Sequence, residues 1–352
     1  MTNVRQNLVR LLIGSAATIF FFWLFLQSAN LGDAWKEIRS LPGWAIGGAL
    51  GFVLANVGFI SLRWRYLFAA ARYQPQARRL LPIFCVGAGA NNVLPARGGD
   101  LLRIESVRQY YRIPPFVTAG TLFAERLLDG IVLSVWILMG AIWIGKSGTL
   151  LLVGIALSAG CTLGIVLVAL AARRPESVEE LIWKATKRLP ARWHTRVGRW
   201  TANFVEGLGA FRSRRSLVRA LWTSVAIWLC DFGLYVIIGE AYGINLSAGG
   251  YFLLEGVGNL ALGVPATAAG LGSFDYLTLI SAQQLDVPDN LGPAYVLTVH
   301  AFVVIPVTIL GVIFLRTAFP RVFGTKDDKV RQQEAVEEQL HQDAYKEAQD
   351  LS

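Results

Sequence analysis

The stretch that decides the fold is LLPIFCVGAGANNVLPARGGDLLRIESVRQYYR, which runs from Leu80 to Arg112. Its apolar beginning, Leu80 to Ala90, is too short to cross about 30 Å of hydrocarbon as a helix. Polar residues, Pro95 and a glycine pair then interrupt it within NNVLPARGGD. Irregular backbone inside a membrane persists only where protein buries it or where it lines an aqueous cavity. The pattern therefore predicts a re-entrant segment, which enters the membrane, turns and leaves on the same side.

The composition is that of an integral membrane protein. Hydrophobic residues make up 54% of the 352 residues and charged residues 16%, against about 25% charged in soluble domains. Cys85, Cys161 and Cys230 lie far apart in apolar runs, which predicts buried free thiols. The chain contains no phosphate loop, nucleophile elbow, dinucleotide fingerprint or metal-ligand motif at a usable spacing. We therefore expect no cofactor, no metal and no enzymatic activity.

Six apolar stretches reach the length of about 20 residues that a spanning helix needs. The first follows Arg5 and Arg10 and lacks a cleavage site, so we interpret it as a retained helix. Two further stretches, 80–111 and 250–285, are apolar but interrupted. The sequence predicts an all-α membrane bundle with two re-entrant helix pairs and full spans at about 8–28, 43–62, 116–144, 149–172, 219–241 and 293–316.

Basic residues orient this bundle. Between Arg173 and Arg219 there are twelve Lys or Arg against four acids, and Arg63 and Arg65 follow the second predicted span. Since cytoplasmic loops collect basic residues, we expect loop 173–218 and both termini in the cytoplasm. The net charge of +9 is then mainly a topology signal, and nucleic acid is not an expected partner.

This orientation predicts two inverted halves, about 8–144 and 149–318, within a transmembrane domain of residues 1–318. Each half has two spans, a re-entrant pair and a third span, and the odd number of crossings inverts the second half. VLPARGGD at 93–100 is echoed by GVPATAAGLGSFD at 263–275, and Asn56-Val-Gly-Phe by Asp231-Phe-Gly-Leu. Inverted repeats with broken helices occur in transporters. Residues 319–352 are expected to form a charged cytoplasmic tail.

NNVLPARGGDLLR at 91–103, FAERLLDG at 123–130, GVPATAAGLGSFDYL at 263–277 and RWRYL at 63–67 resemble the flippase-like membrane domain of the lysylphosphatidylglycerol synthase family. The resemblance covers about residues 8–318. It implies a location in the inner membrane of a bacterial cell and lipid movement between the leaflets of that membrane. The fused members of the family carry a soluble aminoacyl-transferase domain after the membrane part, which this sequence is not expected to contain. The family motifs do not choose among phospholipids, aminoacyl lipids, polyprenyl-linked glycolipids and hopanoids.

Arg97 is the first candidate for a binding residue. It follows the break at Pro95 and precedes Gly98 and Gly99, where a helix N-terminus and a guanidinium can converge on an anion. One interpretation is that Arg97 and Arg103 hold a lipid phosphate. The other is that Arg97 pairs with Asp100 or Glu125 to fix the turn.

Glu125, Arg126 and Asp129 lie early in the third predicted span, with the two acids on one helix face. Charges inside a span normally face a bundle interior or a cavity. They fit either a headgroup site or proton gate, or a structural ion pair with Arg97 or Arg103.

Asp231 lies near the middle of the fifth span, and its relation to Asn56 suggests that both face a central cavity. It is the best candidate for proton coupling. His300 in the last span is expected to be a packed histidine. No Lys or Arg occurs from Ala220 to Leu315, which fits an acidic outer cavity or simply the topology. The remaining cavity candidates around the two interrupted stretches are Asn92, Glu255, Asn259, Pro265 and Asp275.

The basic stretch from Val178 to Phe211, with Trp183, Trp193 and Trp200, fits a helix on the inner membrane surface or a solvated connector. The leading functional hypothesis is a lipid flippase with a central cavity that opens alternately to each side. The alternative is a non-transporting membrane subunit that organises a lipid- or glycolipid-modifying enzyme. The expected partners are membrane lipids, with such an enzyme or a second copy of the chain as further possibilities.

Overall fold

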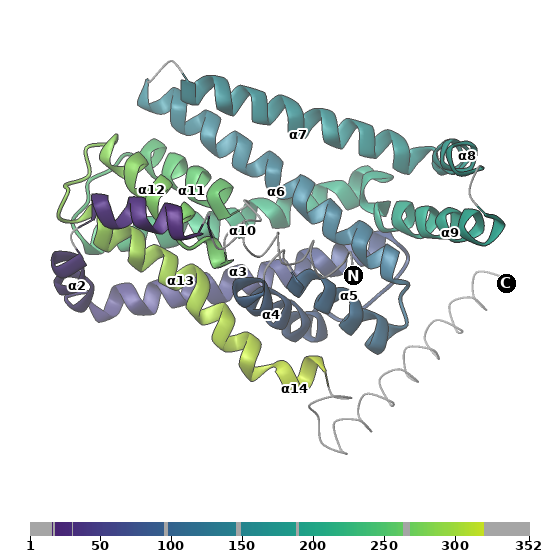
Figure 1. Cartoon of the computed structure of the whole chain (residues 1–352), viewed down its shortest axis with the longest axis horizontal. Helices are drawn as coiled ribbons and strands as arrows, with labels where there is room; N and C mark the ends of the chain where they lie inside the picture. Colours follow the sequence, from purple (N-terminus) through teal and green to yellow (C-terminus); the bar gives the residue numbers. More distant parts are fainter. Residues whose placement is uncertain are drawn as a thin grey trace.

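The computed structural model describes residues 16, 18–29, 31–94, 98–145, 149–187, 190–262 and 268–319, and within these ranges every regular element is a helix (Figure 1). Four of the helices are long and apolar enough to cross a membrane. They confirm the all-α class and four of the predicted membrane-length segments. These four are α3 (Gly43–Ala70), α6 (Pro115–Ile144), α10 (Arg214–Ala241) and α13 (Gly292–Ile313).

Two other predicted spans coincide with helices whose crossing of the membrane stays a prediction. The first predicted span is described only from Thr18 to Ser28, where the chain is a short apolar helix. The fourth corresponds to α7 (Thr149–Arg173), which packs along α6 (Figure 1). The start of α6 has Pro115 in its first turn, and its end has Gly145 in a left-handed conformation at φ 69°, both common at helix ends.

Both interrupted stretches form helical hairpins. In the first, α4 (Ala77–Val93) packs against α5 (Gly98–Tyr111), and Asn91 donates a 3.1 Å hydrogen bond to Asp100 across the tip. In the second, α11 (Ala248–Leu262) packs against α12 (Ser273–Gln283), with the 3₁₀ turn η3 (Ala268–Gly270) between them. The breaks therefore lie where the sequence places them. Whether the hairpins are re-entrant in a membrane stays a prediction.

Two apolar cores lie toward opposite ends of α3. One contains Ala49 and Val53 of α3 and is built mainly with α10, α11, α12 and α13. The other contains Trp64 and Phe68 of α3 and is built mainly with α4, α6 and the 3₁₀ turn η2 (Gly209–Phe211). The α3 residues between these two cores include the polar Asn56.

One expected boundary is wrong. The apolar pattern predicts that the second span ends at residue 62, with Arg63 and Arg65 in a loop, but α3 continues to Ala70. Arg63 is consequently a buried helical residue, whereas Arg65, two residues later in the same helix, is exposed. Charge alone does not distinguish the two positions, because both follow a long apolar run.

The basic stretch 178–211 is likewise not a single helix. It contains α8 (Pro175–Thr186) and α9 (Ala191–Gly207), whose contact includes Trp183 and His194 rings with centroids 3.6 Å apart. α9 packs closely on α6, because a Cβ at Gly207 would overlap the Val117 carbonyl oxygen. The remaining short helices are α2 (Leu31–Arg39) and α14 (Leu315–Ala318).

Candidate functional site

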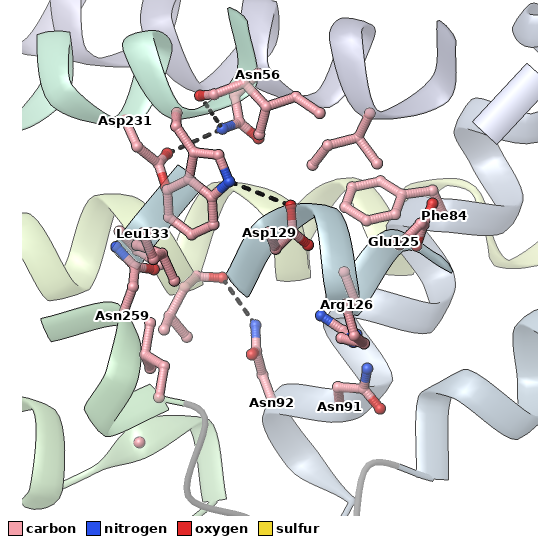
Figure 2. A pocket seen from close by; sticks show the side chains of 18 of the residues that line it. Asn56, Phe84, Asn91, Asn92, Glu125, Arg126, Asp129, Leu133, Asp231 and Asn259 are labelled. Carbon is pink, nitrogen blue, oxygen red and sulfur yellow. Dashed lines mark hydrogen bonds between the residues drawn. The ribbon is translucent and has the colours of Figure 1, made fainter. Parts of the chain in front are cut away.

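A cavity of about 420 Å³ lies between the tips of the two hairpins (Figure 2). The first hairpin contributes Asn91 and Asn92, and the second contributes Asn259 and Ala269. The walls come from α3, α6, α10 and α13, so segments from both ends of the sequence meet around one space. The charged residues of the lining are Arg63, Arg103, Glu125, Arg126, Asp129 and Asp231, and its larger apolar residues include Ile60, Phe84, Leu133 and Val303.

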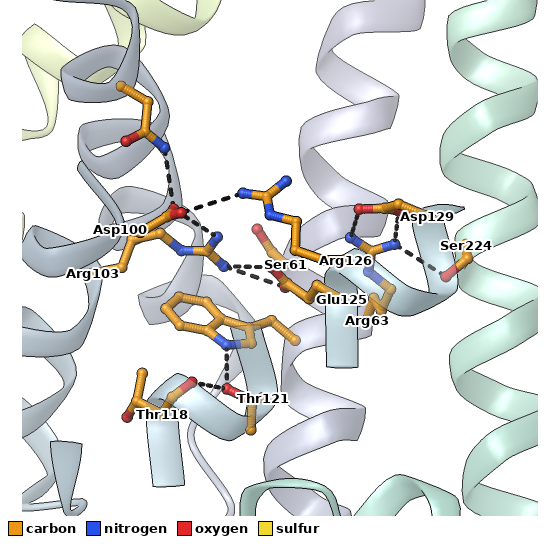
Figure 3. Close-up of polar contacts among 12 residues, drawn as sticks. Ser61, Arg63, Asp100, Arg103, Thr118, Thr121, Glu125, Arg126, Asp129 and Ser224 are labelled. Carbon is orange, nitrogen blue, oxygen red and sulfur yellow. Dashed lines mark hydrogen bonds and ion pairs between the residues drawn. The ribbon is translucent and has the colours of Figure 1, made fainter. Parts of the chain in front are cut away.

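Arg63 and Asp129 form the most tightly bonded ion pair of the lining. Two guanidinium nitrogens of Arg63 lie 2.5 and 3.3 Å from the two Asp129 carboxylate oxygens, and Arg63 also donates to the Ser224 hydroxyl at 3.0 Å (Figure 3). The Trp228 indole N–H donates to Asp129 at 3.2 Å. Arg63 is only 3% exposed. The pair and its hydrogen bonds thus join α3, α6 and α10.

Arg103 and Glu125 form the second buried pair. Arg103 donates to both Glu125 carboxylate oxygens at 3.1 and 3.2 Å, and each side chain is 3% exposed. The Arg103 guanidinium lies 4.1 Å from the centroid of the Trp64 ring, a cation–π contact. Trp64 is held in turn by a 3.1 Å hydrogen bond to Thr121. Glu125 is therefore in a structural ion pair with Arg103, one of the two partners expected for it.

Arg126 differs from these two arginines because it is 46% exposed. Its guanidinium lies 3.5 Å from an Asp100 carboxylate oxygen, at the limit of a hydrogen bond (Figure 3). Asp100 also accepts from Asn91 and lies 3.9 Å from Arg103. Arg126 consequently has donors exposed to a molecule in the cavity, whereas Arg63 and Arg103 are buried and each faces a carboxylate.

Asn56 and Asp231 both line the cavity, on opposite helices. The Asn56 side-chain amide donates to Asp231 at 2.9 Å and to the Ile227 carbonyl at 3.1 Å (Figure 2). Among the described residues Asp231 has no basic partner within ion-pair distance. The expectation that Asn56 and Asp231 face a common cavity agrees with these positions.

The remaining candidate residues and the cysteines have the following positions in the structure. Gly99 is packed against Gly87 in the first hairpin, and Gly98 begins α5. Glu255 is fully buried and does not line the cavity, whereas Asn259 of the same helix does. Pro95, Arg97 and Pro265 lie outside the described residues, as does the side chain of Cys161. Cys85 is buried and Cys230 partly buried, and both are free thiols.

Asp275 fixes the turn of the second hairpin instead of lining the cavity. One Asp275 oxygen accepts from the Gly272 N–H at 2.9 Å, and the other lies 2.7 Å from His300 Nδ1. His300 Nε2 lies 2.9 Å from the Ala269 carbonyl oxygen. Ala269 has φ 52°, a left-handed conformation that is unfavourable for alanine, so these bonds stabilise a strained turn. His300 is a packed histidine, as expected.

Arg63 is the charged residue of the cavity lining that the sequence interpretation missed. A signal for it existed in the helical spacing, because Asn56, Ile60 and Arg63 are separated by four and three residues and share one face of α3. Within the described residues no group of three or more His, Cys, Asp or Glu side chains is arranged to hold a metal ion. The arrangement as a whole is a polar, ion-paired cavity inside an apolar bundle.

The family model for the lysylphosphatidylglycerol synthase TM region matches residues 7–311. The chain belongs to this family. The match includes both hairpins and every residue that lines the cavity. It identifies the chain as a member of a family of membrane regions. It leaves the activity of this member open.

A curated protein named glycosyltransferase AglD, from Haloferax volcanii, is 26% identical to this family member over 259 residues. The alignment covers 61% of the present chain and 39% of AglD. The chain therefore aligns with less than half the length of that relative. No solved structure matches the chain.

Proposed function

We propose that this protein is a lipid transporter that moves a lipid headgroup between the two leaflets through the cavity. The observation that carries the proposal is the placement of three arginines and three carboxylates around one cavity, among helices long enough to cross a membrane. Charged groups inside membrane proteins are costly and usually mark substrate or ion pathways. An aqueous, polar cavity lowers the cost of carrying a headgroup across hydrocarbon, while the acyl chains stay in the bilayer.

The proposed mechanism is alternating exposure of the cavity by two inverted halves, each with a re-entrant hairpin. Two observations support this mechanism. Both hairpins contribute residues to the cavity lining, and α4 and α5 pack in one apolar core while α11 and α12 pack in the other. Apolar length favours six full spans, and the distribution of basic residues favours cytoplasmic termini. Membership of the family favours a bacterial inner membrane as the location. The first hairpin then begins and ends on the cytoplasmic side, and the second on the outer side.

Arg126 is the proposed contact for an anionic headgroup such as a phosphate. A guanidinium matches a phosphate with two parallel hydrogen bonds, and Arg126 is the arginine of the described lining with the greatest exposure. Its weak pairing with Asp100 is easily exchanged for a ligand. Arg97 stays a second candidate, as expected from the sequence.

The test is translocation of a fluorescent phosphatidylglycerol by the purified protein in vesicles, followed by chemical quenching of the outer leaflet. Arg126→Ala is expected to slow translocation about tenfold or more, the size of one charge-assisted interaction lost. The matched control is Arg108→Ala, because Arg108 is an exposed α5 arginine paired with Glu105 at 2.7 Å and outside the cavity. Equal rates for the Arg126→Ala variant and the wild type would refute this headgroup site.

A second proposal is a non-transporting subunit that organises a lipid- or glycolipid-modifying enzyme. The observation in its favour is the alignment with part of a protein named as a glycosyltransferase. This proposal predicts that the pure protein moves no lipid in vesicles and that an enzyme of lipid glycosylation co-purifies with it from native membranes. Translocation by the pure protein would decide against it.

A further inference from the structure

Glu255 is a buried carboxyl group that the ion pairs of the cavity do not use. It is 0% exposed in the middle of α11, and neither of its carboxylate oxygens has a hydrogen-bond partner among the described residues. Buried polar groups in native proteins are nearly always bonded, and an unpaired buried carboxylate is particularly unfavourable. The carboxyl group of Glu255 therefore requires either a bound proton or a ligand that the protein itself does not supply.

Three other buried polar atoms around α11 also lack partners among the described residues, namely Trp136 Nε1, Tyr235 Oη and Thr278 Oγ1. The hydroxyls of Tyr235 and Thr278 face the same point, because a Cβ at Gly258 would lie 2.8 Å from one and 3.0 Å from the other. Gly258 is one helical turn from Glu255. The Trp136 indole lies close enough to interact with Glu255 without forming a hydrogen bond of normal geometry.

This cluster is close to the cavity. Glu255 and Asn259 are separated by four residues on α11, and the Asn259 side chain reaches the cavity while donating to the Glu255 carbonyl at 3.0 Å. Asp231 and Tyr235 are separated by four residues on α10, and Asp231 lines the cavity. Tyr235 interacts electrostatically with both Glu255 and Asp231. α10 and α11 thus each carry one residue that lines the cavity and, one helical turn away, one residue of the buried cluster.

The surroundings of Glu255 determine which ligand fits. The ionisable groups that act on it are Asp231 and Tyr235 from α10 and Tyr295 from α13. The contributions of α6 and α12 to the cluster, Trp136 and Thr278, are not ionisable. No basic side chain is among these groups, and an indole N–H is unsuitable as a ligand of a metal cation. A proton satisfies the site, because a neutral carboxyl group has a lower desolvation cost and can donate to a hydroxyl.

We propose that Glu255 is a buried proton-binding site which exchanges its proton with the cavity through Tyr235 and Asp231, and so couples lipid movement to proton movement. The coupling rests on the proposed lipid transport, whereas the proton site does not. In loading, the Asp231 O–H bond breaks and its proton passes through water from the cavity to the Tyr235 oxygen, which gives its own proton, likewise through water, to the Glu255 carboxylate. Asp231 becomes the carboxylate, Glu255 becomes the acid and Tyr235 is unchanged.

Infrared spectroscopy of the purified protein tests the proton site without any transport. The wild type should retain a protonated-carboxyl band at about pH 8, where ordinary carboxyl groups are ionised. The isosteric Glu255→Gln variant should lose this band, and the control Glu240→Gln, at an exposed position on α10, should keep it. Absence of the band in the wild type, or its persistence in Glu255→Gln, would overturn the proposal.

Tyr235→Phe provides a second variant should Glu255→Gln fail to fold. Removal of the hydroxyl should leave the band in place but shift its frequency, because the carboxyl group loses a neighbouring acceptor. An unshifted band would exclude Tyr235 from the site.

Vesicles with a pH gradient test the coupling. Translocation by the wild type should respond to the gradient, and Glu255→Gln should translocate at a rate independent of it. A gradient response that survives Glu255→Gln would overturn the coupling. If the wild type moves no lipid at all, the proposed function fails, and the infrared result alone still decides whether Glu255 binds a proton.

Discussion

At the scale of single residues, the sequence is informative about charges inside a helix and uninformative about charges near its end. Glu125, Arg126 and Asp129 could be assigned to a cavity because a charge within an apolar span rarely faces lipid. Arg63 could not, because it has the same position in the pattern as the exposed Arg65. The burial of a residue depends on which neighbouring helix covers it. Arg63 is covered by α6 and α10, which are far from it in the sequence.

The buried Arg63–Asp129 pair leads to a prediction about stability. Arg63→Ala should lower the free energy of unfolding by about 3 kcal/mol or more, because it leaves Asp129 without the cation that compensates its burial. The measurement is reversible unfolding in detergent micelles. Arg65→Ala is the control, and its effect should be within about 0.5 kcal/mol since this side chain is exposed. Equal effects of both substitutions would show that the pair does not stabilise the fold.

At the scale of elements, the sequence predicts the hairpins because an apolar run too short to span, followed by Pro and Gly, leaves few alternatives. It does not reveal how the hairpin helices pack. α4 presents glycines to two neighbours, with Gly87 against Gly99 of α5 and Gly89 against Thr308 of α13. Small residues let helices in membranes approach closely. The close contact of α4 therefore depends on the facing residues of α5 and α13 as much as on its own glycines.

Gly99 provides the test of this packing. A Cβ at this position would overlap the Gly87 carbonyl oxygen and lie 2.7 Å from the Asn91 backbone nitrogen, so Gly99→Ala must move α5 away from α4. The expected loss of stability is about 1–3 kcal/mol, as for other overpacked sites. Thermal unfolding in detergent measures it. Gly58→Ala on α3 is the control, because nothing lies within 4 Å of the added Cβ. A harmless Gly99→Ala would contradict the close hairpin contact.

At the scale of the whole molecule, the sequence predicts the membrane-length helices better than their arrangement. Apolar length is a local property, so four spans are recovered, with the largest boundary error at the end of α3, which continues to Ala70. The assembly of one cavity from distant segments depends on contacts between residues more than 150 positions apart, such as Asn56 of α3 with Asp231 of α10. The weak repeat of Asn56-Val-Gly-Phe and Asp231-Phe-Gly-Leu was the only sequence pattern that joined these two positions.

The proposed inverted arrangement predicts opposite sidedness for two exposed positions. In a background with all three cysteines replaced by alanine, Arg192→Cys at the start of α9 should react with a membrane-impermeant maleimide only from the cytoplasmic side. Asn290→Cys, before α13, should react only from the outer side, because an odd number of predicted crossings separates the two positions. Both positions are exposed in the fold, so lack of reaction reports sidedness. Labelling of both cysteines from one side would refute the topology.

The two apolar cores also constrain how such a protein can be divided or extended in evolution. Each core takes helices from both halves of the sequence, since α3 and α10 contribute to both. A break between the halves would therefore divide two cores at once and leave neither half with a complete interior. The two halves therefore form one folding unit.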